Sequence, residues 1–264
     1  MRGAWSMMRG ISLHALEVSV PVGLVALWWY LGDTALTSFY FPALRDIWAT
    51  FRATWLFARV GSDVVPTMTG IVLGYATSVV LGVTLGVTLG GFPRVNEFIS
   101  PLLEFFRALP AIAAVPIFIV LIGVSLKMEV AVVTFAALWP ILLNARDAVA
   151  GVDPVVRDTS RSYRIRPVDR LLRVTLPSAS PQIVAGMRVA LTQSIVIIIV
   201  SELIVSARGI GHYIQTAQWD FDITAMWSGL ILIGLIGFAL SKLFQAFEYK
   251  VLTWHRGLHG KAQR

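Results

Sequence analysis

Long apolar runs separated by short polar segments dominate the chain. A helix needs roughly 20 mostly apolar residues to cross a bilayer. Six runs are apolar enough to be candidates, near residues 16–31, 64–90, 99–123, 128–145, 184–205 and 223–247. The pattern therefore predicts an all-α integral membrane protein with about six transmembrane helices. For the first run, a cleavable signal peptide is the alternative, although no small-x-small cleavage site follows Gly32.

Composition supports a membrane protein and excludes several other classes. Of the 264 residues, 56% are hydrophobic and only 14% are charged, whereas soluble domains carry about 25% charged residues. The formal charge is +7, but the basic residues lie in short segments between apolar runs, which argues against a nucleic-acid-binding surface. The chain has no cysteine, which excludes disulfides and thiolate metal sites.

The distribution of Lys and Arg predicts the topology. With six spans, both termini lie on one side of the membrane. If that side is the cytoplasm, 16 of the 22 Lys and Arg lie inside and five outside, and Arg107 lies within a helix. This is the asymmetry of the positive-inside rule. We divide the chain into an N-terminal helix with an outer amphipathic loop (1–62), a core transmembrane domain (63–250) and a cytoplasmic tail (251–264).

Small and proline residues mark special positions within the runs. In the second run, small residues recur at every fourth position, at Gly70, Gly74, Ser78, Gly82, Gly86 and Gly90. They share one helix face, which favours a packing seam over a pore lining because small residues let two helices approach closely. Pro110, Pro116 and Pro140 lie inside runs and predict kinks.

The longest polar stretch, residues 146–182, is expected on the cytoplasmic side. Asp153-Pro154 reads as a helix start, because Asp caps helices and Pro suits the first helical position. Pro167 opens a second short helix, and Pro177 and Pro181 are expected to close the segment. Two short helices on the membrane surface favour a docking element for a soluble partner. An ordinary solvated positive-inside loop is the alternative.

This stretch resembles the EAA loop of ABC importer permeases. In that family the loop reads Glu-Ala-Ala, three residues, Gly, nine residues, Ile, one residue, Leu-Pro. Here Asp158-Thr159-Ser160, Arg164, Val174 and Leu176-Pro177 stand at the matching positions. The family glycine ends the first coupling helix with a turn, and glycine takes left-handed angles freely. Arg164 in its place means that the turn is built differently or that coupling is weaker.

The flanking residues extend the resemblance over about residues 60–250. Val152-Asp153-Pro154 and the segment 186–190 look like the usual flanks of the loop. Ser201-Glu202-Leu203 followed by Gly209-Ile210-Gly211 is similar to the branch that imports nitrate, aliphatic sulfonates and taurine. The resemblance implies a type I ABC importer permease fold in the bacterial inner membrane, and a small anionic solute as cargo. It leaves the exact substrate open, because related permeases are thought to carry pyrimidine vitamin precursors.

The resemblance also implies partners and a coupling surface. A second permease subunit, identical or different, soluble P-loop ATPases and an extracytoplasmic binding protein are expected. The chain has no Gly-x-x-x-x-Gly-Lys-Ser/Thr motif, so it is not expected to be an enzyme, and ATP and Mg²⁺ belong to the ATPase. The leucines are expected to fill a cleft of the ATPase and the arginines to form rim ion pairs. The predicted coupling residues are Asp158, Thr159, Ser160, Arg161, Arg164, Arg166, Arg170, Leu171, Leu172, Leu176 and Pro177.

Polar residues within the runs are further candidates. A carboxylate at membrane depth is a functional candidate by default, so Glu202 either serves transport or bonds the loop near Gly209. Three polar residues of the same run, Thr192, Gln193 and Ser194, line a translocation path or bond neighbouring helices. Glu104 and Arg107 are three apart and can pair on one helix face. Arg107 as an anion contact is the alternative.

Two other function classes compete with the importer subunit. A stand-alone secondary transporter or channel usually couples through charged residues deep in the membrane, and this chain has few. A membrane enzyme would show clustered His, Asp or Glu at membrane depth. His255 and His259 are four apart, but nearby glycines and the lack of an acid argue against a metal site.

Overall fold

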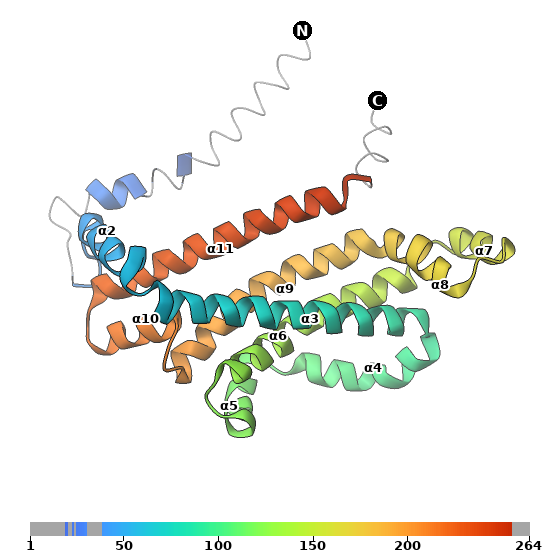
Figure 1. Cartoon of the computed structure of the whole chain (residues 1–264), viewed down its shortest axis with the longest axis horizontal. Helices are drawn as coiled ribbons and strands as arrows, with labels where there is room; N and C mark the ends of the chain where they lie inside the picture. Colours follow the sequence, from blue (N-terminus) through green and yellow to red (C-terminus); the bar gives the residue numbers. More distant parts are fainter. Residues whose placement is uncertain (1–18, 21–22, 24, 31–38, 255–264) are drawn as a thin grey trace, which may run out of the picture. The chain divides into compact units, whose positions relative to one another are not determined.

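A computed structural model describes residues 19–20, 23, 25–30 and 39–254, and the regular elements there are helices (Figure 1). Residues 25–30 are helical, whereas the rest of the first expected span lies largely outside the described residues. His255 and His259 also lie outside them. The chain forms two compact units, one of residues 1–59 and 214–232 and the other of residues 60–213 and 233–264.

The first unit holds the amphipathic N-terminal segment. Helix α2 (Leu44–Ala53) buries Ile47 and Phe51 and exposes Trp48. A π-helical turn, η1 (Thr54–Ala58), continues it, and the indole N–H of Trp55 donates to the hydroxyl of Ser228, 3.2 Å away. Ser228 belongs to the first turns of α11 (Ile223–Val251). This bond fixes η1 to the start of the last long helix.

The second unit is built on three long helices. They are α3 (Val65–Gly91), α6 (Leu126–Ala150) and α9 (Leu176–Val205), which run side by side (Figure 1). Their shared core is aliphatic, with Val132, Val133 and Ile198 almost fully buried. A short π-helical turn, η2 (Val60–Val64), leads into α3.

The small-residue face of α3 is a packing seam against α6. A Cβ added at Gly82 would lie 2.8 Å from Ile141, and one at Gly86 would lie 2.5 Å from the carbonyl oxygen of Leu142. Such distances leave no room for a side chain, so glycine sets the helix separation. The expected seam is confirmed.

Polar bonds also join the long helices. The hydroxyl of Tyr75 on α3 donates to the Met187 carbonyl of α9, at 3.0 Å, and Thr134 on α6 donates to the Gly74 carbonyl of α3, at 3.2 Å. Arg188 on α9 forms an ion pair with Glu248 on α11. These bonds supplement close packing where hydrophobic burial adds little between helices in lipid.

Four helical stretches in the described residues are long and apolar enough to span a membrane, Val60–Gly91, Leu126–Ala150, Pro167–Val205 and Ile223–Val251. A fifth span arises only if α4 (Pro93–Ala108) and α5 (Ala111–Ile122), bent by 93°, count as one. The expected span over 99–123, with a kink expected at Pro110, is therefore two helices separated at Leu109 and Pro110. Leu109 is extended (ψ 124°) because the following proline disfavours helical angles in the preceding residue. Pro116 and Pro140, in contrast, lie inside continuous helices.

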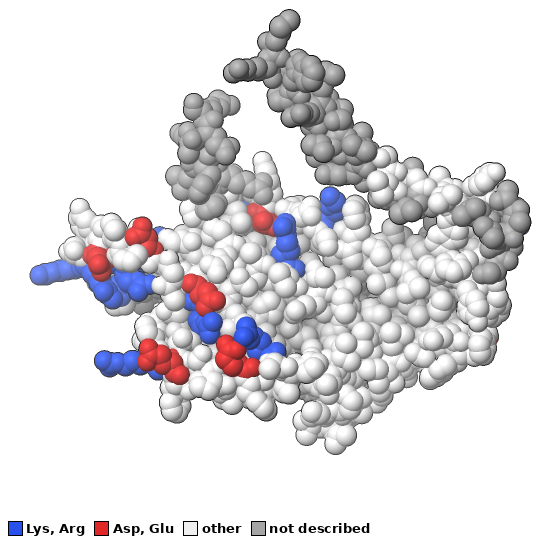
Figure 2. Space-filling view, turned by 180° about the vertical axis from the view of Figure 1, so that it is seen from behind, with Lys and Arg blue, Asp and Glu red and all other residues white. Residues whose placement is uncertain are grey.

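Between α6 and α9 lie the short helices α7 (Pro154–Ser162) and α8 (Pro167–Arg170) and the π-helical turn η3 (Leu171–Thr175). We call residues 151–175 the α7–η3 segment. The first expected short helix is confirmed as α7. The second, expected to begin at Pro167, is instead the start of a helical stretch that continues to Val205, so the expected end of the loop at residue 182 is wrong. Helix α9 begins at Leu176, directly after the π-helical turn η3, and the backbone stays helical across that junction. Charged side chains gather at one end of the face in Figure 2.

Candidate functional site

The α7–η3 segment begins with a helix whose two ends are capped. The Asp153 side chain accepts the backbone N–H of Val155, at 2.8 Å, and caps the N-terminus of α7. At the C-terminus, the Ile165 N–H donates to the Ser160 carbonyl at 3.1 Å, and the Arg164 N–H donates to the Arg161 carbonyl at 2.9 Å. These two bonds form a Schellman motif, which places a left-handed residue just after the helix.

Arg164 is that left-handed residue, with φ at 53°. Arginine therefore takes the left-handed angles at the position where the resemblance implies glycine. An L-residue in this region costs roughly 1–2 kcal/mol relative to a right-handed conformation. This cost falls on the stability of the segment.

Arg157 fixes α7 to the end of α6. Its guanidinium donates to the carbonyls of Val149, at 3.3 Å, and Ala150, at 3.1 Å. These are among the last carbonyls of α6, which have no partner within the helix and attract a cation. Sequence reasoning missed Arg157, because its partners are recognisable only once the end of α6 is known.

The remaining predicted coupling residues divide into exposed and packed groups. Asp158 and Arg161 are exposed and lie 3.6 Å apart as an ion pair. Ser160 is buried and bonds the Arg157 carbonyl. The other members of the exposed group are Thr159, Arg164, Arg166 and Leu172, while Arg170, Leu171, Leu176 and Pro177 are partly buried. The predicted leucine pair is therefore split, with Leu172 exposed and Leu171 partly buried.

Large apolar side chains on this segment remain exposed. Val155 is 71% exposed, Tyr163 79%, Val168 67% and Leu172 57%. They alternate with arginines over the whole segment, whereas the adjoining Leu176 packs against the core of α6 and α9. An exposed apolar surface bordered by charge is typical of a protein interaction site.

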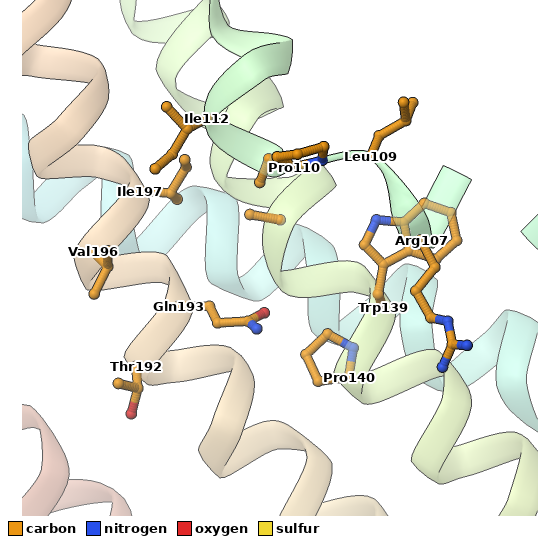
Figure 3. Close-up of a pocket in the computed structure, with 12 residues that line it drawn as sticks. Arg107, Leu109, Pro110, Ile112, Trp139, Pro140, Thr192, Gln193, Val196 and Ile197 are labelled. Carbon is orange, nitrogen blue, oxygen red and sulfur yellow. The ribbon is translucent and has the colours of Figure 1, made fainter. Parts of the chain in front are cut away.

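A cleft of about 410 Å³ lies between the α4–α5 break, α6 and α9 (Figure 3). Most of its lining is apolar, and its polar members come from all three elements. Of the four predicted path residues, the structure places Thr192 and Gln193 in this lining. The polar lining residues are Arg107, Trp139, Thr192 and Gln193, and the apolar ones are Leu109, Pro110, Ala111, Ile112, Ala136, Pro140, Val196 and Ile197.

Ser194 and Glu202 do not line the cleft. Ser194 is fully buried, and its hydroxyl bonds the Ala190 carbonyl of the same helix, at 2.8 Å. Glu202 is 1% exposed; one carboxylate oxygen lies 2.6 Å from the Thr67 hydroxyl, and the other accepts the Gly211 N–H at 2.8 Å. Both groups satisfy their hydrogen bonds inside the protein.

Glu202 belongs to a polar cluster that caps α10 (Ile210–Trp219). Asp63 accepts the Gly209 N–H at 3.3 Å, and the Thr67 hydroxyl accepts the Ile210 N–H at 3.0 Å. Side chains from η2, α3 and α9 thus serve N–H groups that the helix start leaves without a partner. A Cβ at Gly209, where φ is 107°, would overlap the Glu202 carboxylate. This geometry matches the hydrogen-bonding alternative for Glu202.

Arg107 has two roles in the geometry. Its guanidinium pairs with the Glu104 carboxylate at 2.5 Å, and both side chains are about half exposed. The expected pair is confirmed. The same side chain also lines the cleft. Among the described residues, no group of three or more His, Cys, Asp or Glu is placed to hold a metal ion.

Comparison with known proteins identifies the family. Residues 78–252 match the family of the binding-protein-dependent transport system inner membrane component. The chain belongs to this family. It is 23% identical over 261 residues to the taurine transport system permease protein of Escherichia coli K12, covering 97% of this chain and 94% of that protein. It is 28% identical over 181 residues to the bicarbonate transport system permease protein of Synechococcus elongatus, covering 68% and 65%.

The solved structures include the MetNI methionine ABC transporter in inward-facing conformations. The match has a TM-score of 0.57 at 20% identity, and covers 78% of this chain and 94% of that chain. At this identity the likeness concerns the fold. The expected type I importer permease fold and the expected branch are therefore confirmed, and the chain is a transport component of the membrane.

Proposed function

We propose that this permease is the membrane-spanning subunit of an ATP-driven importer whose cargo carries an anionic group. Its relatives are named for taurine, which bears a sulfonate, and for bicarbonate. A binding protein outside the membrane delivers the cargo, and a second permease subunit completes the path. The chain lies in a bacterial inner membrane with both termini in the cytoplasm, in keeping with its excess of Lys and Arg on that side.

The single observation that carries this proposal is the architecture of the α7–η3 segment. The short helix α7 is joined by a Schellman turn to the helical stretch that begins at Pro167, and the segment presents exposed Val155, Tyr163 and Leu172 between arginines. A segment that served only as a solvated loop needs neither helix caps nor exposed apolar side chains. A soluble P-loop ATPase is the partner that this surface fits, and it supplies the ATP and Mg²⁺ sites.

The helices offer a route by which movement of the ATPase would reach the cleft. The η3 turn runs directly into α9, and α9 carries Gln193 to the cleft. Arg157 binds α7 to the end of α6, which carries Trp139 to the same cleft. A displacement of the segment therefore acts on both helices, because helices transmit displacement as rigid elements.

Substitution of Leu172 tests this assignment. Leu172→Asp is expected to weaken association with the ATPase by about ten-fold or more, since a fully buried leucine contributes about 1.5–3 kcal/mol. Membrane insertion stays intact because the side chain is 57% exposed in the permease. The assay tags the C-terminus, extracts the complex in mild detergent and quantifies the copurifying ATPase.

The matched control is Gln218→Asp, which adds the same charge at an exposed position of α10, on the side expected to face outward. It is expected to retain the ATPase fully. A Leu172→Asp variant that retains the ATPase and transports normally would contradict the hypothesis that the α7–η3 segment docks the ATPase. Transport by the purified permease alone in liposomes would instead favour a stand-alone secondary transporter or channel.

A further inference from the structure

The cleft of Figure 3 combines an apolar wall with hydrogen-bond donors from three separate elements. Arg107 lies on α4 just before the break, Trp139 on α6 and Gln193 on α9. In the figure, the Gln193 amide extends from α9 towards Pro140 on α6. A largely apolar pocket with a few convergent polar groups is the usual form of a small-molecule site.

The donors outnumber the groups that only accept. A guanidinium and an indole N–H donate and cannot accept, while an amide and a hydroxyl do both. The indole nitrogen of Trp139 is buried, and in the described part of the chain it has no hydrogen-bond partner, so it can donate to a ligand in the cleft once the ring turns to expose it. None of the residues that line the cleft carries a carboxylate. The lining therefore favours an anionic oxygen group over a cation.

The break between α4 and α5 forms part of the cleft wall. Non-helical backbone at membrane depth is tolerated where it is buried in protein or lines a cavity. Here Leu109 and Pro110, which form the break, are themselves lining residues. The break also places Arg107 at the cleft, and its pairing with Glu104 leaves it half exposed and partly neutralised.

We propose that this cleft is a subsite for the anionic oxygen group of the transported solute, with Arg107 supplying the charge and Trp139 and Gln193 supplying N–H donors. The identification of the ligand as cargo rests on the proposed importer function. The cleft volume of about 410 Å³ suits a small solute. A sulfonate or carboxylate accepts several hydrogen bonds at once, as this donor set requires.

The test uses the full-length permease with its copurified ATPase in phosphatidylcholine nanodiscs. Trp139 fluorescence reports occupancy: a ligand response that is present in the protein and lost in the Trp139→Phe variant either comes from this indole or depends on its bond to the ligand. Methanesulfonate is the probe, and dimethyl sulfone is its neutral isostere. We expect a saturable Trp139 response to methanesulfonate and none to dimethyl sulfone at equal concentration. Equal responses to both, or none to either, would overturn the subsite.

Substitutions test whether Arg107 supplies the positive charge that binds the ligand. Arg107→Gln and Gln193→Leu are each expected to weaken the methanesulfonate response by about ten-fold, as loss of a hydrogen bond to a charged group does. Glu104→Gln is expected to strengthen it several-fold, because it removes the carboxylate that competes for Arg107. If the pair served only to hold α4 together, Glu104→Gln and Arg107→Gln would change the response in the same direction.

Two further arms of the experiment distinguish cargo from lipid and the subsite from the importer function. If phosphatidylglycerol nanodiscs abolish the response, a lipid headgroup occupies the cleft, and the cargo assignment fails. The ATPase content of each sample tests the proposed function independently. Wild-type complex that retains its ATPase but ignores methanesulfonate would overturn the subsite alone. A permease that binds methanesulfonate but never copurifies an ATPase would contradict the importer function and leave an anion site.

Discussion

The left-handed arginine in the α7–η3 segment predicts the effect of restoring glycine. Arg164 has φ at 53°, where an L-residue pays roughly 1–2 kcal/mol and glycine does not. Glycine also loses more entropy on ordering, which cancels part of that gain. We expect Arg164→Gly to stabilise the closed turn by about 0.5–1 kcal/mol, or about two- to five-fold in its opening equilibrium.

Hydrogen exchange measures this opening at the turn itself. The Ile165 N–H is held by the Ser160 carbonyl at 3.1 Å, so it exchanges only when the Schellman motif opens. In Arg164→Gly its exchange is expected to slow by about two- to five-fold. The control is Tyr163→Gly, where φ is already −76°; glycine relieves no strain there and is expected to speed exchange. Unchanged or faster exchange of the Ile165 N–H in Arg164→Gly would show that the left-handed backbone of Arg164 is not strained.

The same variant separates strain from recognition. If Arg164 serves only the turn, Arg164→Gly retains or improves copurification of the ATPase, because the segment is better ordered before docking. If association falls while Ile165 exchange slows, the guanidinium makes a contact of its own with the partner. The two measurements on one variant therefore distinguish the conformational role of residue 164 from its chemical role.

Two other predictions concern the transmembrane core. Gly86→Ala is expected to lower the midpoint of thermal unfolding by several degrees, because its Cβ would lie 2.5 Å from the Leu142 carbonyl oxygen and such overpacking costs about 1–3 kcal/mol. The control is Gly91→Ala, whose Cβ would have nothing within 4 Å. This variant is expected to unfold like the wild type. Glu202→Ala is expected to destabilise by about 1–3 kcal/mol, because it leaves the buried Gly211 N–H without an acceptor. An unfolding midpoint equal to that of the wild type would show that this cap adds no stability.

The apolar pattern predicted the long helices because a membrane forces each backbone group to bond within its own segment. The expected runs 64–90 and 223–247 agree with α3 and α11 to within a few residues. The predicted ends of the helices were less accurate where a helix continues into polar sequence, as at the start of α9 near Leu176. There, serine and proline suggested a loop, although Pro177 is compatible with the first turn of a helix.

Features that depend on distant partners had no local signal. Glu202 and Thr67 are 135 residues apart in sequence and 2.6 Å apart in the structure, so only the fold reveals that this carboxylate is a helix cap. Pro110 was expected to kink a continuous span; whether a proline kinks or breaks a helix depends on whether neighbours bond the freed carbonyls. The position of Arg107 at a cleft follows from that break.

The cleft and the α7–η3 segment are connected by the same two helices, which makes the order of ATP-driven events testable. Helices α6 and α9 each have one end at the segment and a side chain at the cleft, Trp139 and Gln193 respectively. If displacement of the segment shifts α9 along α6, it separates the donors and weakens their joint hold on an anion. ATP binding by the attached ATPase is then expected to weaken the methanesulfonate response of Trp139. In Leu172→Asp, whose attachment to the ATPase is weaker, ATP is expected to have a smaller effect on that response. An ATP effect that persists without the ATPase would rule out transmission through this segment.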